Sequence, residues 1–173
     1  MITKVISGFQ SGVDAMGVCV ARSLGISTGG TTTPNFGQEN GVNAEYAAKQ
    51  FGIVACTEDE ERAFRISHPN LSRGQYYYLP RTERNVIDSD ATVYFATDMD
   101  SAGAWATERF AIDHNKLFFM YNRDFTTADE LVAFIKDSNV QILNVAGNRG
   151  SKLSAEELES FATILRLALT ATV

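Results

Sequence analysis

The chain has 173 residues, of which 45% are hydrophobic and 21% are charged. That length suits one domain with a buried core, and the composition is ordinary for a globular protein. The formal net charge of −6 argues against general nucleic-acid binding, which needs a basic face. The two cysteines are too few for a disulfide framework, and the sequence holds no apolar run of the ~18 residues that a membrane span needs. We therefore expect a cytoplasmic protein with no membrane association.

A glycine-containing turn near the N-terminus joins an expected strand at residues 4–7 to an amphipathic helix that begins at Val13. The N-terminus of a helix presents unpaired N–H groups and the positive end of its dipole, which suits a phosphate or another anion. The spacing matches neither G-x-G-x-x-G nor a Walker A motif. This turn is therefore either an anion site or a plain strand-to-helix connection. Its residues are Gly8, Phe9, Gln10, Ser11 and Gly12.

Strands and helices alternate through the first half of the chain. Residues 57–80 show no sustained period, and we expect an irregular, lid-like segment there that either binds a ligand or packs on the surface. The other expected elements are a helix at 13–24, a strand at 26–28, a glycine- and threonine-rich loop at 29–33, a helix at 43–50 and a strand at 53–56.

The same alternation continues in the second half, where two capping boxes, at 127–130 and 154–157, open helices. The expected elements are a helix at 81–90, a strand at 91–96, a loop at 97–103, a helix to about 114, a strand at 117–120, a helix at 128–135, a strand at 141–145, a loop at 146–151 and a final helix.

This order predicts one α/β domain with a Rossmann-like open parallel sheet and helices on both faces. Ligands of such sheets bind beyond the carboxyl ends of the strands, where the strand order reverses. The loops at 8–12, 29–33, 97–103 and 146–151 all follow expected strands. We therefore expect them to gather at one edge of the sheet and form a ligand site.

Dispersed motifs in this order resemble the molybdenum-cofactor-carrier family of the SLOG superfamily, Rossmann-like domains that also include the lysine-decarboxylase-like phosphoribohydrolases. The motifs are SGFQSGVD at 7–14, TGG at 28–30, RTERNV at 81–86 with DSD at 88–90, and LNVAGNR at 143–149. They span most of the chain, so the resemblance implies one SLOG-like domain over residues 1–173.

The resemblance implies a phosphate-bearing, nucleotide-like ligand: a nucleotide, a nucleotide-derived signal or a molybdopterin-type cofactor. The protein would then be a non-catalytic carrier, sensor or sequestering (sponge) protein, and a molybdenum cofactor carrier is the alternative nearest to it. The resemblance also implies a homo-oligomer, either a dimer or a larger assembly. No metal ligands are expected.

Two departures from the family pattern open further alternatives. Phe9 stands where the family has glycine, so its ring either stacks on a base or fills the pocket and leaves an occluded protein-interaction module. The phosphoribohydrolase signature is absent except for Glu108, which would be the catalytic carboxylate of such an enzyme or else a surface residue.

The expected contacts place one phosphate at the first turn and another at the helix start near Ser101. Arg81 and Arg149 are the expected charge partners, and Asp14 is expected to shape the turn. The full set of expected ligand contacts is Gly8, Phe9, Gln10, Ser11, Gly12, Gly30, Thr31, Arg81, Asn85, Ser101, Gly103, Asn148 and Arg149.

Overall fold

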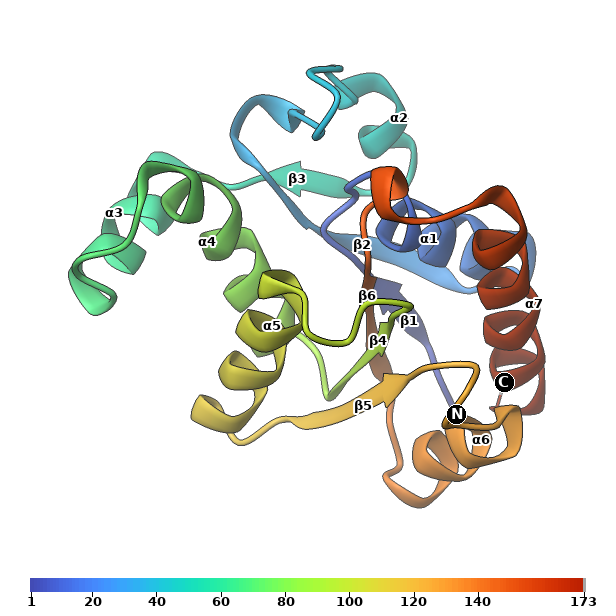
Figure 1. Ribbon diagram of the computed structural model, residues 1–173. Helices are drawn as coiled ribbons and strands as arrows, with labels where there is room; N and C mark the ends of the chain where they lie inside the picture. The colour runs from blue at the N-terminus through green and yellow to red at the C-terminus, as the bar shows by residue number, and fades with distance from the viewer. Residues whose placement is uncertain (173) are drawn as a thin grey trace.

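Six parallel strands form one sheet in the computed structural model, which describes residues 1–172 (Figure 1). The strand order is β3-β2-β1-β6-β4-β5, so the order reverses beside β1 and β6. In the register of the three central strands, Val5 lies opposite Thr28 on one side and Leu143 on the other. The strands are β1 (Lys4–Ile6), β2 (Ser27–Thr32), β3 (Ile53–Ala55), β4 (Ala91–Phe95), β5 (Leu117–Tyr121) and β6 (Ile142–Gly147).

The helices cover both faces of the sheet. Helices α1, α6 and α7 pack together on one face, and α3, α4 and α5 pack together on the other (Figure 1). The short α2 lies beside the edge strand β3. The helices are α1 (Val13–Ser23), α2 (Glu45–Gln50), α3 (Glu58–Ser67), α4 (Arg73–Ile87), α5 (Ala102–Asp113), α6 (Ala128–Asp137) and α7 (Ala155–Thr172), with 3-10 turns η1 (Pro34–Phe36) and η2 (Gly150–Lys152).

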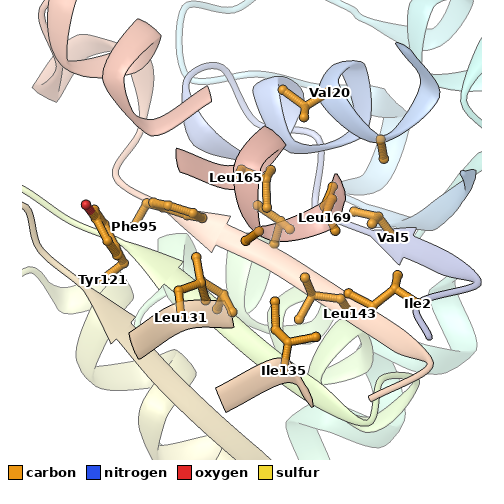
Figure 2. Close-up of a cluster of buried hydrophobic side chains, with 14 of the residues drawn as sticks. Ile2, Val5, Val20, Phe95, Tyr121, Leu131, Ile135, Leu143, Leu165 and Leu169 are labelled. Carbon is orange, nitrogen blue, oxygen red and sulfur yellow. The ribbon is translucent and has the colours of Figure 1, made fainter. Parts of the chain in front are cut away.

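The largest hydrophobic core lies between the sheet and helices α1, α6 and α7 (Figure 2). Phe95 and Leu143 point into it from β4 and β6, and Leu165 enters it from α7. Every residue of β4 is buried, as expected for a parallel strand that is covered on both faces. Within residues 1–172, no helix combines the length and the apolar character that crossing a membrane requires.

The prediction of an irregular segment at 57–80 is wrong. The segment forms α3 and the first half of α4, and a capping box opens each helix, with Thr57 and Glu60 at α3 and Ser72 and Gln75 at α4. The predicted helix start at 81 is also wrong, because α4 begins at Arg73 and Pro80 lies inside it. A proline removes one helical hydrogen bond, but Pro80 is buried within α4 and the helix continues past it to Ile87.

The predicted loop at 29–33 is also wrong over most of its length, because β2 continues through Thr32. The Asn85 side chain accepts from Thr31 N (2.9 Å) and donates to Thr31 O (2.8 Å), so it supplies the pairing that a neighbouring strand would give. Gly30 has a φ of 129°, and a Cβ there would collide with the Ser7 carbonyl. The remaining predicted elements are confirmed with shifted ends.

The burial of α7 leads to a stability prediction. Leu165 is fully buried, whereas Leu167 on the same helix is 55% exposed. Replacing Leu165 with Ala should lower the free energy of unfolding by about 3 kcal/mol, because the helix loses apolar contacts and leaves a cavity. Leu167→Ala, the matched control, should change it by less than about 0.5 kcal/mol. Urea unfolding measures both values, and equal effects would contradict the placement of α7.

Candidate functional site

A cleft of about 610 Å³ lies beyond the carboxyl ends of β1, β4 and β6. It is bounded by the first turn, by the starts of α4 and α5, and by the segment that follows β6. Its lining is formed by Gln10, Asp14, Ser72, Gly74, Gln75, Tyr78, Leu79, Arg81, Thr82, Tyr94, Asp98, Ser101, Ala102, Gly103, Ala106, Gly147, Asn148, Arg149, Ser151 and Lys152. The position beside the reversal of strand order is the one expected for a ligand site in an open parallel sheet.

A second cavity of about 50 Å³, here called the inner chamber, adjoins the cleft and shares part of its lining: Asp14, Arg81, Thr82, Tyr94, Gly103 and Gly147. Gly8 and Asn85, two of the expected contacts, line the chamber.

A buried ion pair separates the cleft from the protein interior. Arg81 Nη1 donates to Asp14 Oδ2 over 2.9 Å, and the two side chains are only 14% and 5% exposed. Gly8 allows this approach, because a Cβ at that position would collide with the Arg81 guanidinium. Burial raises the pKa of the Asp14 carboxyl, and the opposing effects of the Arg81 charge and of N–H donors from Gln10 and Gly147 do not cancel the rise.

The polar side chains of the first turn form hydrogen bonds with other residues of the protein. Gln10 Nε2 donates to Gly37 O (2.9 Å), and Gln10 Oε1 accepts from Glu39 N (3.2 Å). Ser11 Oγ donates to Glu39 Oε1 (2.5 Å). These bonds hold the turn against residues 37–39. Gln10 and Ser11 therefore bind other residues of the protein, whereas the sequence suggested that they bind phosphate.

The Glu39 carboxylate lies between the first turn and the segment that follows β6, where the sequence suggested a bound anion. Besides Ser11, it accepts from Ser151 N (3.0 Å) and Ser151 Oγ (2.6 Å), and Arg149 Nε lies 3.6 Å away. The side chain is 11% exposed. Burial alone would raise the pKa of Glu39, but the Ser11 and Ser151 hydrogen bonds and the Arg149 charge outweigh it, so that the pKa is lowered.

The remaining expected contacts lie outside both cavities. Phe9 is buried against Val18, Ala48 and Ile53, so its ring neither lines nor fills the cleft. The backbones of Gly12 and Arg149 pair in an isolated antiparallel β-bridge. Because Gly12 has no Cβ, residues 148–150 can pass close to it. The others outside the cavities are Ser11, Gly30 and Thr31.

The loop before α5 is organised by one asparagine. Asn148 Oδ1 accepts from Thr97 N (2.9 Å) and Asp98 N (3.0 Å), and its Nδ2 donates to Ser101 Oγ (3.3 Å). Ser101 in turn caps α5 by accepting from Ala104 N. The structure thus brings three expected contacts, Asn148, Ser101 and Gly103, to one side of the cleft.

Comparison with protein-family models matches residues 5–167 to the circularly permutated YpsA SLOG family. The chain belongs to that family. The crystal structure of a proposed molybdenum carrier protein from Syntrophus aciditrophicus SB is also similar, with a TM-score of 0.72 and 25% identity over 99% of this chain and 95% of that chain. Among curated proteins, the low molecular mass lipoprotein PBMHPC-23 of Bombyx mori is 27% identical over 120 residues, which cover 67% of this chain. Those residues cover 45% of the lipoprotein, so the chain spans less than half the length of that relative.

The sequence left open whether residues 57–80 bind a ligand, and the structure of this SLOG protein places the start of α4 in the cleft wall. Tyr78 and Leu79 line the cleft, and the Arg149 guanidinium lies 5.7 Å from the centre of the Tyr78 ring. The S-x-x-Q pattern of the capping box at 72–75 was the available signal for α4. Sequence reasoning missed Lys152 and Glu39, and no sequence pattern marks them.

Glu108 lies on the exposed side of α5, outside both cavities. The phosphoribohydrolase alternative therefore loses the carboxylate on which it depended. Within residues 1–172, no three His, Cys, Asp or Glu side chains are grouped so as to hold a metal ion.

The lowered pKa of Glu39 leads to a prediction about pH. Glu39→Gln should lower the free energy of unfolding by about 2 kcal/mol at pH 7, because the charged acceptor of three hydrogen bonds is lost. A carboxyl with a lowered folded-state pKa stabilises the fold above its unfolded pKa of about 4.3, and that contribution disappears as the pH falls through the folded-state value. The difference between wild type and Glu39→Gln should therefore shrink below about pH 4.

Urea unfolding at a series of pH values measures this difference. Glu159→Gln, at an exposed position of α7, is the control and should have almost no effect at any pH. A difference at Glu39 that does not depend on pH would contradict the assigned role.

Proposed function

We propose that the cleft binds a phosphate-bearing, nucleotide-like small molecule and that the protein acts as a non-catalytic carrier, sensor or sequestering protein. The observation that carries this proposal is the 610 Å³ cleft at the reversal of strand order, with cationic side chains and two helix starts around it. Its volume is within the usual range of ligand sites.

The outer part of the cleft favours an anion. Arg149 and Lys152 line it, and so do the first residues of α4 and α5, where free N–H groups and the helix dipoles favour negative charge. Glu39 lies 3.6 Å from the guanidinium of Arg149 and offsets part of its charge, but Lys152 forms no ion pair within residues 1–172. We assign the phosphate to this outer part.

One wall of the cleft suits a flat ring. Tyr78, Leu79 and Ala106 supply aromatic and apolar surface beside the cationic part. A base or a pterin ring that packs there would keep its attached phosphate near Arg149. This pairing of ring surface and positive charge supports a nucleotide-like ligand over a simple inorganic anion.

Binding without catalysis is supported by the carboxylates around the cleft. Asp14 is held by Arg81, and Asp98 is an exposed loop residue. Glu108 lies on the exposed side of α5 and does not line the cleft, so it is not placed to assist the cleavage of an N-glycosidic bond there. The occluded-module alternative also loses its basis, because Phe9 packs outside an open cleft.

A molybdopterin-type cofactor is the second candidate, and the similar Syntrophus protein is the observation that favours it. The residues present fit its phosphate at Arg149 and Lys152 and its ring at Tyr78. The chain would then supply binding and protection, while the chemistry would belong to the cofactor.

Isothermal titration with purine nucleoside monophosphates, cyclic nucleotides and a molybdopterin preparation tests the proposal. Arg149→Gln and Lys152→Gln should each weaken the binding of the best ligand about tenfold, because a charge-assisted hydrogen bond to phosphate is lost. The control Lys136→Gln removes the same charge from exposed α6 and should leave the affinity unchanged.

The recovered ligand is then examined by chromatography. An intact molecule supports a binding protein, whereas a released base or ribose phosphate would contradict the non-catalytic role. An equal loss of affinity in Lys136→Gln would contradict the location of the phosphate site.

A further inference from the structure

Helix α5 lies beside the edge strand β5, and one of its faces is open to solvent (Figure 1). Its buried side chains, such as Ala104 and Phe110, pack toward the rest of the protein. On the opposite side, Trp105 is 64% exposed and Ile112 is 65% exposed. These two side chains lie about two helical turns apart and therefore share one face. A tryptophan exposed to this extent is unusual on a free surface but common in protein interfaces.

Two opposite charges lie between these apolar side chains. Glu108 and Arg109 are both exposed, and with Trp105 and Ile112 they occupy positions i, i+3, i+4 and i+7 of one helix face, here called the α5 stripe. Arg109 Nε donates to Asp113 Oδ2 (3.0 Å) within the helix. Glu108 forms no ion pair within residues 1–172. The stripe thus offers two apolar contacts and one carboxylate that is free to pair.

The α5 stripe is complementary to a second copy of itself. Trp105 precedes Glu108 by as many residues as Ile112 follows Arg109. About a twofold axis that passes between Glu108 and Arg109, an antiparallel second α5 therefore brings its Ile112 against Trp105 and its Arg109 against Glu108. Apolar side chains meet apolar side chains, and each charge meets its opposite. An isologous interface requires this kind of self-complementarity.

Other occupants match the α5 stripe less well. A membrane surface and a nucleic acid are both anionic and attract faces that carry only positive charge, so the Glu108 carboxylate opposes either of them. Tryptophan and arginine are enriched in protein interfaces, which favours a protein partner. A second copy of this chain supplies both the apolar contacts and the reversed order of charges.

We propose that two chains form a symmetric homodimer by packing their α5 helices antiparallel. Trp105 and Ile112 of the two copies form its apolar contacts, and Glu108 and Arg109 form two ion pairs between the chains. One helix pair buries less surface than a standard protein interface, so the dimer dissociates in the micromolar range. The four side chains of the stripe do not line the cleft, so dimer formation goes beyond ligand binding and is tested separately from it.

Sedimentation velocity measures the mass of the wild-type protein at concentrations between about 1 and 500 µM, a range that brackets a micromolar dissociation constant. The mass should rise with concentration from the chain mass of 18.9 kDa to twice that value. A protein that stays monomeric over the whole range would overturn the proposal.

Truncation of the exposed tryptophan locates the interface. Trp105→Ala should raise the dissociation constant of the dimer at least about 30-fold, because interface tryptophans are frequent hot spots and the symmetry removes two of them at once. Tyr46→Ala is the control. It removes an 82% exposed aromatic ring from α2, beside the opposite edge strand β3, and should leave the dissociation constant unchanged (Figure 1). Equal dissociation constants for wild type and Trp105→Ala would contradict the assigned surface.

Charge reversal tests the register of the two helices. Glu108→Arg places arginine against arginine across the axis, and Arg109→Glu places glutamate against glutamate, so each variant alone should be monomeric. An equimolar mixture of the two should form a heterodimer, because both facing pairs then carry opposite charges. Circular dichroism checks that each variant is folded. Single variants that dimerise as well as wild type, or a mixture that stays monomeric, would overturn the antiparallel arrangement.

Discussion

The buried ion pair between Arg81 and Asp14 is the interaction on which the ligand edge depends. Asp14 belongs to α1 on one face of the sheet and Arg81 to α4 on the other, so the pair joins the two helix layers beyond the end of β1. Gly8 makes room for it, and Asn85, one turn further along α4, holds the extended part of β2. Buried pairs contribute little net stability, but their geometry is demanding. Here that geometry sets the boundary between cleft and chamber.

The same edge shows why a glycine turn before a helix is not by itself a phosphate site. In the first turn, the N–H of Gln10 donates to Asp14 and the N–H of Val13 to Asn148 O, while Ser11 donates to Glu39. Two of the chain's own carboxylates and the Asn148 carbonyl therefore accept from donors that a phosphate would need. The donors left for a ligand lie across the cleft, at the starts of α4 and α5 and at Lys152.

The sequence predicted the fold well because its strands are short apolar runs and its helices are periodic. It also placed Asn148 and Arg149 at the correct edge, since loops after parallel strands converge there, and it named Arg81, which reaches the same edge from within α4. It failed at α3 and α4, where Pro80 suggested a boundary although two capping boxes marked both helices. Phe9 and Glu39 could not be placed, because their positions depend on contacts with segments distant in sequence, such as Ile53 and Ser151.

The most direct test of the central claim, that the cleft holds a phosphate-bearing molecule, is to identify what the protein carries when it is purified from cells. Wild type and the double variant Arg149→Gln/Lys152→Gln are denatured in parallel, and the released small molecules are identified by mass spectrometry. We expect one intact phosphate-bearing molecule, near one per chain, that is depleted in the double variant. Equal recovery from both proteins, or a wild-type protein that releases no phosphate-bearing molecule, would contradict it.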